Sequence, residues 1–232
     1  MNRHDVENGI HRSWDFLEAL GLAESFSNPG VLPVNEEFRD IALDISTKYT
    51  SLYLTGLRLS HYNVLLQDHS FLQFGWEDGS NLRYAFYPNP FASPGEGISK
   101  FKKIRELFDA DLITLEQYHA LLNDAQPELR VPLMRYENAP GQWRALKHPC
   151  SHFHIGHHSE NRWAVKRILT PLAFTMIITK QYYPDEWILA DEAKEDDFES
   201  SLEGKLISER QNCQIIGDDL FSEPEARSFH FF

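Results

Sequence analysis

Apolar residues recur at helical spacing near the start of the chain. Over residues 6–17 they fall three or four positions apart, after a potential N-cap at Asp5, so we expect an amphipathic helix over residues 5–20. A second helical pattern begins at Asn35. Residues 49–60 fit either its continuation or a strand, so the pattern leaves the end of this helix open.

The middle of the chain carries the strongest β pattern. Three short runs rich in β-branched and aromatic residues, Tyr62–Gln67, Ser70–Glu77 and Leu82–Tyr87, are separated by turn residues. They predict a three-stranded antiparallel meander. Leu129–Tyr136 alternates loosely and predicts a further strand, and the histidine-rich segment 152–158 predicts another.

Helical signals return between and after these strands. Residues 98–123 predict a helical insertion, in which Thr114 and Gln117 have the spacing of a capping box. The dipeptide Thr170-Pro171 is typical of a helix start, and the acidic residues 188–212 predict another helix.

Together these patterns predict a single α+β domain over residues 1–232. Its expected core is an antiparallel sheet of about five to six strands packed against helices from both ends of the chain. We expect a helical part over 1–60, the sheet over 61–158 with the helical insertion 98–123, and C-terminal helices over 170–212.

The composition is that of an ordinary globular protein, because 42% of the 232 residues are hydrophobic and can fill a packed core. No segment approaches the ~20 apolar residues of a membrane span, and none resembles a signal peptide. We therefore expect a cytoplasmic protein without membrane contact. Its two cysteines, Cys150 and Cys213, are expected to stay reduced and to have no catalytic role.

The net charge of −13 is unevenly distributed along the chain. Residues 130–180 carry eight basic side chains against two acidic ones, together with five of the eleven histidines. This segment predicts attraction for a phosphate or carboxylate ligand, such as a nucleotide or nucleic acid. Residues 185–225 carry fourteen acids against three bases, which fits either a solvated helix or a surface for a protein partner.

The leading candidates for chemistry are His152 and His154. Residues two positions apart in a strand project from one face, and Gly156 could let His157 and His158 turn back toward the same space. Because imidazole titrates near pH 6.5, two of them on one face can supply a base and an acid.

Basic residues follow these histidines. Arg162, Lys166 and Arg167 precede the helix expected at Thr170, whose N-terminus presents free backbone N–H groups suited to a phosphate. The combination predicts a metal-independent, ribonuclease-like phosphodiesterase in which His152 and His154 exchange protons and the three basic residues hold the phosphate.

Other functions stay open. The four histidines between 152 and 158 are also compatible with a zinc or manganese site in a metal-dependent hydrolase, if the fold brings a carboxylate such as Glu160, Asp68 or Glu77 near. The histidines could equally form a hydrogen-bonded cluster without chemistry. A non-enzymatic binding subunit of a bacterial defence or toxin–antitoxin assembly is a further alternative, motivated by the acidic C-terminal region and the apolar residues 229–232.

Several segments share a recognisable pattern: Tyr84–Pro90, Pro149–Gly156, Arg162, Arg167–Pro171, Phe174 and Tyr182–Trp187. Through them, most of the chain resembles a known bacterial family, domain of unknown function 2290. This resemblance implies no particular reaction. A more local likeness, over residues 149–180, extends to small toxin–antitoxin proteins, some of which are similar to ribonucleases, and implies a candidate nuclease activity.

Overall fold

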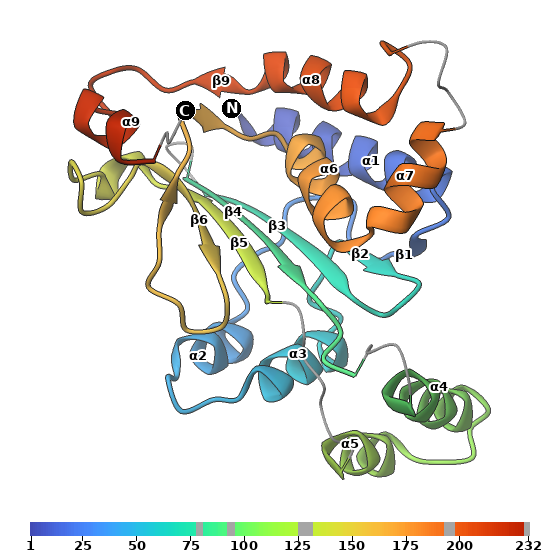
Figure 1. Cartoon of the computed structure of the whole chain (residues 1–232). Coiled ribbons are helices and arrows are strands. Elements are labelled where there is room, and N and C mark those ends of the chain that lie inside the picture. Colours follow the sequence, from blue (N-terminus) through green and yellow to red (C-terminus); the bar gives the residue numbers. More distant parts are fainter. Residues whose placement is uncertain (78–80, 92–95, 125–131, 193–197, 230–232) are drawn as a thin grey trace.

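A computed structural model describes residues 1–77, 81–91, 96–124, 132–192 and 198–229. Within them, a central antiparallel sheet carries helices on both faces (Figure 1). Its strands are β1 (Ala23–Phe26), β2 (Val64–Leu66), β3 (Phe71–Glu77), β4 (Asn81–Tyr87), β5 (Met134–Asn138), β6 (Ser151–Ile155) and β7 (Trp163–Ala164). A second, two-stranded sheet pairs β8 (Arg167–Ile168) with β9 (Gln214–Ile215).

The helices lie before, between and after these strands. They are α1 (Arg3–Ala19), α2 (Glu36–Leu43), α3 (Tyr49–Arg58), α4 (Glu96–Asp109), α5 (Leu115–Asp124), the 3-10 helix η1 (Pro140–Gln142), α6 (Pro171–Tyr182), α7 (Pro184–Glu192), α8 (Leu202–Asn212) and α9 (Glu223–Phe229). None of the helices in the described part of the chain is long and apolar enough to span a membrane.

The strands of the main sheet lie side by side in chain order, and each is antiparallel to the next. This confirms the α+β class and the predicted meander, which is β2–β3–β4. The sheet has seven strands within the described residues, beyond the five to six expected, because β1 and β7 are too short to leave an alternating pattern. In addition, β1 lies inside the part expected to be helical.

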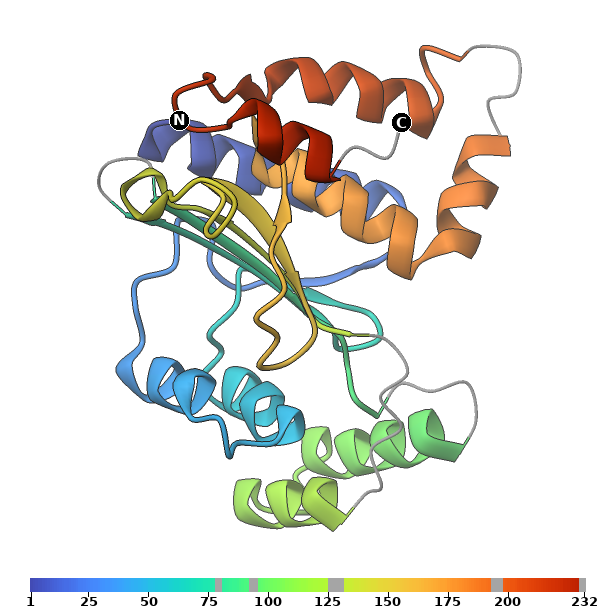
Figure 2. The same cartoon turned by 60° about the vertical axis from the view of Figure 1, so that its left-hand side comes forward.

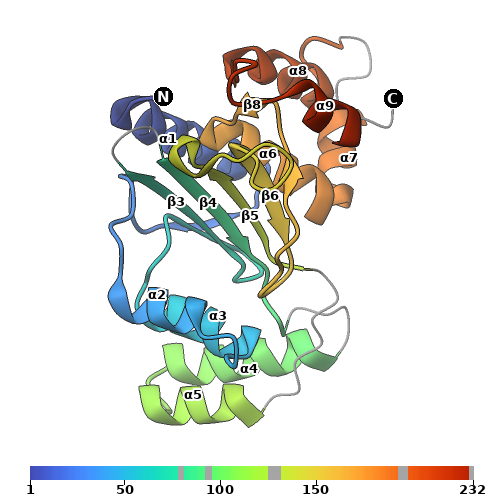
Figure 3. The same ribbon diagram turned by 90° about the vertical axis from the view of Figure 1, so that its left-hand side faces the viewer.

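The two faces of the sheet pack against different layers of helices (Figures 2 and 3). On one face, Tyr84 and Phe153 lie against Phe174 of α6, with ring centroids 5.8 and 6.4 Å away, and α1 joins the same core. On the other face, Phe71 and Tyr87 stack at 4.8 Å in the core that includes α3.

Side-chain caps fix most of the predicted helix starts. Thr114 and Gln117 form the predicted capping box, and the Thr170 hydroxyl accepts from the Ala173 backbone N–H at 3.0 Å. The first helix begins earlier than expected, because Asn2 and Asp5 exchange side-chain and backbone hydrogen bonds at 2.9 Å. Asp5 is therefore the third residue of α1 and not its cap.

Three further predictions need correction. Residues 49–58 form a separate helix, α3, because the chain turns away after α2. The acidic helix expected over 188–212 is two helices, α7 and α8, and residues 193–197 between them lie outside the described residues. The strand expected over 129–136 is found at 134–138; residues 129–131 and the chain end at 230–232 also lie outside the described part.

Close packing of α1 on α6 predicts a destabilising substitution at Gly9. A Cβ atom there would lie 2.6 Å from Pro171 Cδ and 2.8 Å from Pro171 Cγ, and the proline ring cannot rotate away. We expect Gly9→Ala to lower the free energy of unfolding by roughly 1–2 kcal/mol through overpacking, as measured by urea unfolding. Gly141→Ala is the matched control, because its Cβ would meet nothing within 4 Å. Equal stability of the two variants would contradict this packing.

Candidate metal centre

The register of β5 and β6 brings four polar side chains together. Glu137 lies opposite His152 and Arg135 lies opposite His154 in this antiparallel pair. Side chains at directly opposite positions project from the same face of a sheet. The two histidines therefore share a face, as predicted, and the preceding strand adds a carboxylate to it.

The two imidazoles contact one another through their Nε2 atoms, which are 3.0 Å apart. Each Nδ1 faces a backbone carbonyl, that of Pro149 for His152 at 3.0 Å and that of Ser159 for His154 at 3.2 Å. A carbonyl oxygen only accepts hydrogen bonds, so both carbonyls have a donor only when each Nδ1 carries the proton. In the neutral state, both Nε2 lone pairs then point at each other.

Burial keeps both rings neutral. His152 has no exposed surface and His154 is 5% exposed. Burial, followed by the neighbouring His154, lowers the pKa of His152 to about 4. Burial, followed by the charge of Arg135, also lowers the pKa of His154. Each neutral ring keeps a single N–H, and when both of these protons lie on Nδ1 toward the carbonyls, the two facing Nε2 lone pairs have no donor between them.

Glu137 completes a set of ligands. One ligand atom each from Glu137, His152 and His154 lies within 4.8 Å of the others, the only such group of three found in the described residues. The two Nε2 atoms, 3.0 Å apart, and the Glu137 carboxylate are thus close enough together that one divalent ion could be held by all three side chains. Backbone carbonyls that orient metal-binding imidazoles through the second ring nitrogen are typical of metal centres. The arrangement can therefore hold a divalent transition metal.

The other two histidines of the segment are directed elsewhere. Gly156 has φ of 100° and His158 has φ of 53°, so the chain turns sharply after β6. His157 and His158 both place Nε2 near the carbonyl oxygen of Thr47, at 2.8 and 3.1 Å. They connect this turn to the loop between α2 and α3. The structure therefore does not bring the four histidines together as one set of metal ligands.

Of the three residues predicted to bind phosphate, two lie away from the histidines. The Arg167 guanidinium donates to the carbonyl oxygens of Arg210 and Cys213, at 3.1 and 2.9 Å. Lys166 is paired with Asp218 at 3.1 Å. Only Arg162 stays close enough to His154 for its charge to lower the pKa of that ring. The sequence prediction that all three basic residues lie beside the histidines therefore needs correction, because Lys166 and Arg167 have other partners.

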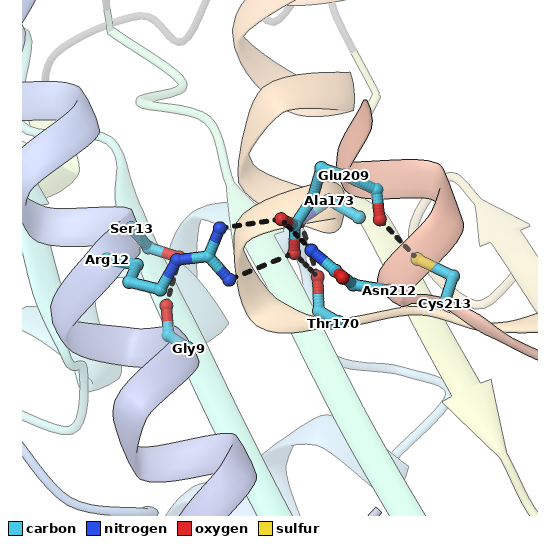
Figure 4. Close-up of polar contacts among 8 residues, drawn as sticks. All are labelled: Gly9, Arg12, Ser13, Thr170, Ala173, Glu209, Asn212 and Cys213. Carbon is cyan, nitrogen blue, oxygen red and sulfur yellow. Dashed lines mark hydrogen bonds and ion pairs between the residues drawn. The ribbon is translucent and has the colours of Figure 1, made fainter. Parts of the chain in front are cut away.

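The helix N-terminus at Thr170 also lies away from the histidines. Phe153, between the two histidines in sequence, packs on α6, so His152 and His154 point away from that helix. The Thr170 hydroxyl instead donates to Glu209 of α8 at 2.6 Å (Figure 4). This helix end thus meets a carboxylate of the same chain.

The candidate metal centre lies inside a recognised sequence family. The family model described as "uncharacterized conserved protein (DUF2290)" matches residues 25–232. The chain belongs to the DUF2290 family. All three candidate ligands fall within this DUF2290 match. No curated protein and no solved structure matches the chain, so the likeness of residues 149–180 to toxin–antitoxin proteins stays a prediction.

Glu137 is the functional candidate that sequence reasoning missed. The signal was present, because Arg135 and Glu137 alternate in the strand that precedes β6, with the same spacing as the histidines. Only the register places the acid opposite His152, since a shift of one residue would move it to the other face.

Proposed function

We propose that His152, His154 and Glu137 bind a divalent metal ion, zinc or manganese, and that this centre catalyses a hydrolytic reaction. The proposal rests on the two Nε2 lone pairs that face each other at 3.0 Å while each Nδ1 is held by a carbonyl. Two neutral imidazoles and one carboxylate are a ligand set of catalytic zinc sites and of other transition-metal sites.

Three protein ligands leave coordination positions for water and substrate, which favours catalysis over a purely structural site. When bound, the metal would supply Lewis acidity and lower the pKa of a coordinated water. The protein's own contribution is orientation. The carbonyls of Pro149 and Ser159 hold both rings, and Arg83 places its Nε 3.8 Å from the Glu137 carboxylate.

The metal-independent phosphodiesterase stays a prediction with weaker support. That mechanism needs an imidazole nitrogen directed at the substrate, whereas each Nδ1 is occupied by a carbonyl and each Nε2 by the other ring. If the protein cleaved RNA or nucleotides at full rate after complete metal removal, this earlier mechanism would replace the one proposed here.

Metal analysis of the purified full chain tests the proposal. We expect about one zinc or manganese ion per chain, and weaker binding by at least about tenfold after His152→Gln or Glu137→Gln. Glu137→Gln keeps the size and shape of the side chain and removes only its charge, so we expect this variant to fold even if the fully buried His152 does not tolerate change. His157→Gln is the matched control and should bind metal normally. Absence of stoichiometric binding, or an equal loss in the control, would overturn the proposal.

A further inference from the structure

Two arginines flank the candidate ligands. Arg135 lies directly opposite His154 in the register, where opposed Cβ atoms are about 5 Å apart. Arg162 lies just before β7, the next strand along the sheet. The antiparallel register of β6 and β7 pairs His152 with Ala164 and Phe153 with Trp163, so its continuation by one position sets Arg162 against His154.

Each of these arginines keeps a hydrogen-bond donor without a partner. Within the described residues, the Nε atoms of Arg135 and Arg162 are shielded from solvent and make no hydrogen bond. The two outer nitrogens of Arg162 do have partners, the carbonyl and the carboxylate of Glu160, both at 3.1 Å. A buried N–H group without an acceptor is unfavourable, so these two donors indicate an acceptor that the chain itself does not supply.

The charge around the centre selects the kind of acceptor. Three arginines, Arg83, Arg135 and Arg162, lie around the centre against two acids, Glu137 and Glu160. Both ion pairs among them are weak, because Arg83 is 61% and Glu160 is 87% exposed. Adding a divalent cation makes the surroundings strongly positive. Guanidinium groups match the geometry of an oxyanion with several terminal oxygens, and a dianion such as phosphate balances this charge better than a monoanionic carboxylate does.

We propose that Arg135 and Arg162 bind the phosphoryl oxygens of a phosphate-bearing substrate beside His154. This inference rests on the proposed metal centre for the reaction, and it names the substrate class as a phosphate ester. Arg135 replaces Arg167 and Lys166 as the partner of Arg162, because the Arg167 side chain binds carbonyls at the C-terminal end of α8 and Lys166 pairs with Asp218 in the loop after β9.

Calorimetric titration of the metal-loaded full chain with inorganic phosphate tests the inference. We expect phosphate to bind and acetate to bind more weakly. Arg135→Gln and Arg162→Gln should each weaken phosphate binding roughly tenfold or more. Lys166→Gln is the matched control, since this lysine forms a surface ion pair with Asp218, and it should leave the affinity unchanged.

Metal content, measured on the same samples, separates the two proposals. If metal binds at full stoichiometry but phosphate does not, or if the arginine variants bind phosphate as the parent does, the inference is overturned and the metal centre stands. If acetate binds as tightly as phosphate, the substrate class is wrong. If no metal binds, the proposed function fails, whatever the phosphate titration shows.

Discussion

Saturation with zinc or manganese, at about one hundred times its dissociation constant, is expected to raise the melting temperature of the full chain by roughly 5–10 °C. A ligand that binds only the folded state at this excess adds ~2.7 kcal/mol, and each kcal/mol shifts the melting temperature of a chain this size by about 2–4 °C. The ligands come from two adjacent strands, so the unfolded chain does not present them together.

Three variants test whether this thermal shift arises from metal bound at the candidate centre. His152→Gln and Glu137→Gln should melt at the same temperature with and without metal, whereas His157→Gln should keep the full shift. Addition of a chelator to the metal-loaded parent should reverse it. A shift of the same size in all three variants would mean that metal binds elsewhere, for instance to surface carboxylates, and would count against the site.

Replacement of Glu209 by alanine is expected to lower the free energy of unfolding by about 3 kcal/mol, because charge-assisted hydrogen bonds are lost from a buried site. Glu209 is 3% exposed and accepts from Arg12 at 2.6 Å, Thr170 at 2.6 Å and Asn212 at 2.8 Å (Figure 4). It thereby connects α1, the start of α6 and α8. Urea unfolding of the full chain measures the loss.

Two comparisons show whether the effect comes from this cluster. Glu209→Gln, which keeps the shape and one carbonyl acceptor, should recover part of the stability. Glu223→Ala removes an acid that is paired with Arg227 at the surface, where the two side chains are 74% and 78% exposed, respectively. It should therefore change stability far less. Equal losses for Glu209→Ala and Glu223→Ala would show that Glu209 does not hold the helices together.

The local parts of the fold were predictable from sequence because their causes are local. The meander β2–β3–β4 follows from alternating apolar residues separated by turns, and the starts of α5 and α6 follow from capping side chains. The shared face of His152 and His154 is likewise a property of one strand.

The site was only partly predictable, because its remaining members depend on contacts between segments far apart in sequence. Which face of β6 meets α6 is decided by packing of Phe153 on Phe174, and a single strand does not encode that choice. The role of Arg167 depends on α8, whose carbonyls lie more than forty residues away. Proximity in sequence therefore gave the wrong partners for the histidines.

The acidic C-terminal region illustrates the same limit. Its composition alone predicts a solvated or partner-binding surface. In the structure, however, several of its acids pair within the chain: Asp218 with Lys166, Glu203 with Lys180 and Glu209 with Arg12. The pairs of Lys166 and Lys180 neutralise part of the basic segment, whereas Arg12 belongs to α1. The binding of a protein partner at the remaining acids stays a prediction.

The pairing of Arg12 with Glu209 spans 197 residues, whereas every strand of the main sheet pairs with its neighbour along the chain. The sheet can therefore assemble in chain order as the polypeptide leaves the ribosome, since each new strand pairs with the strand made before it. The first helix can pack on β1 and β3 soon after it is made, but the side of α1 that meets α6 and Glu209 of α8 has to wait for the C-terminal part of the chain. During translation, this side of α1 is thus an exposed surface that favours aggregation.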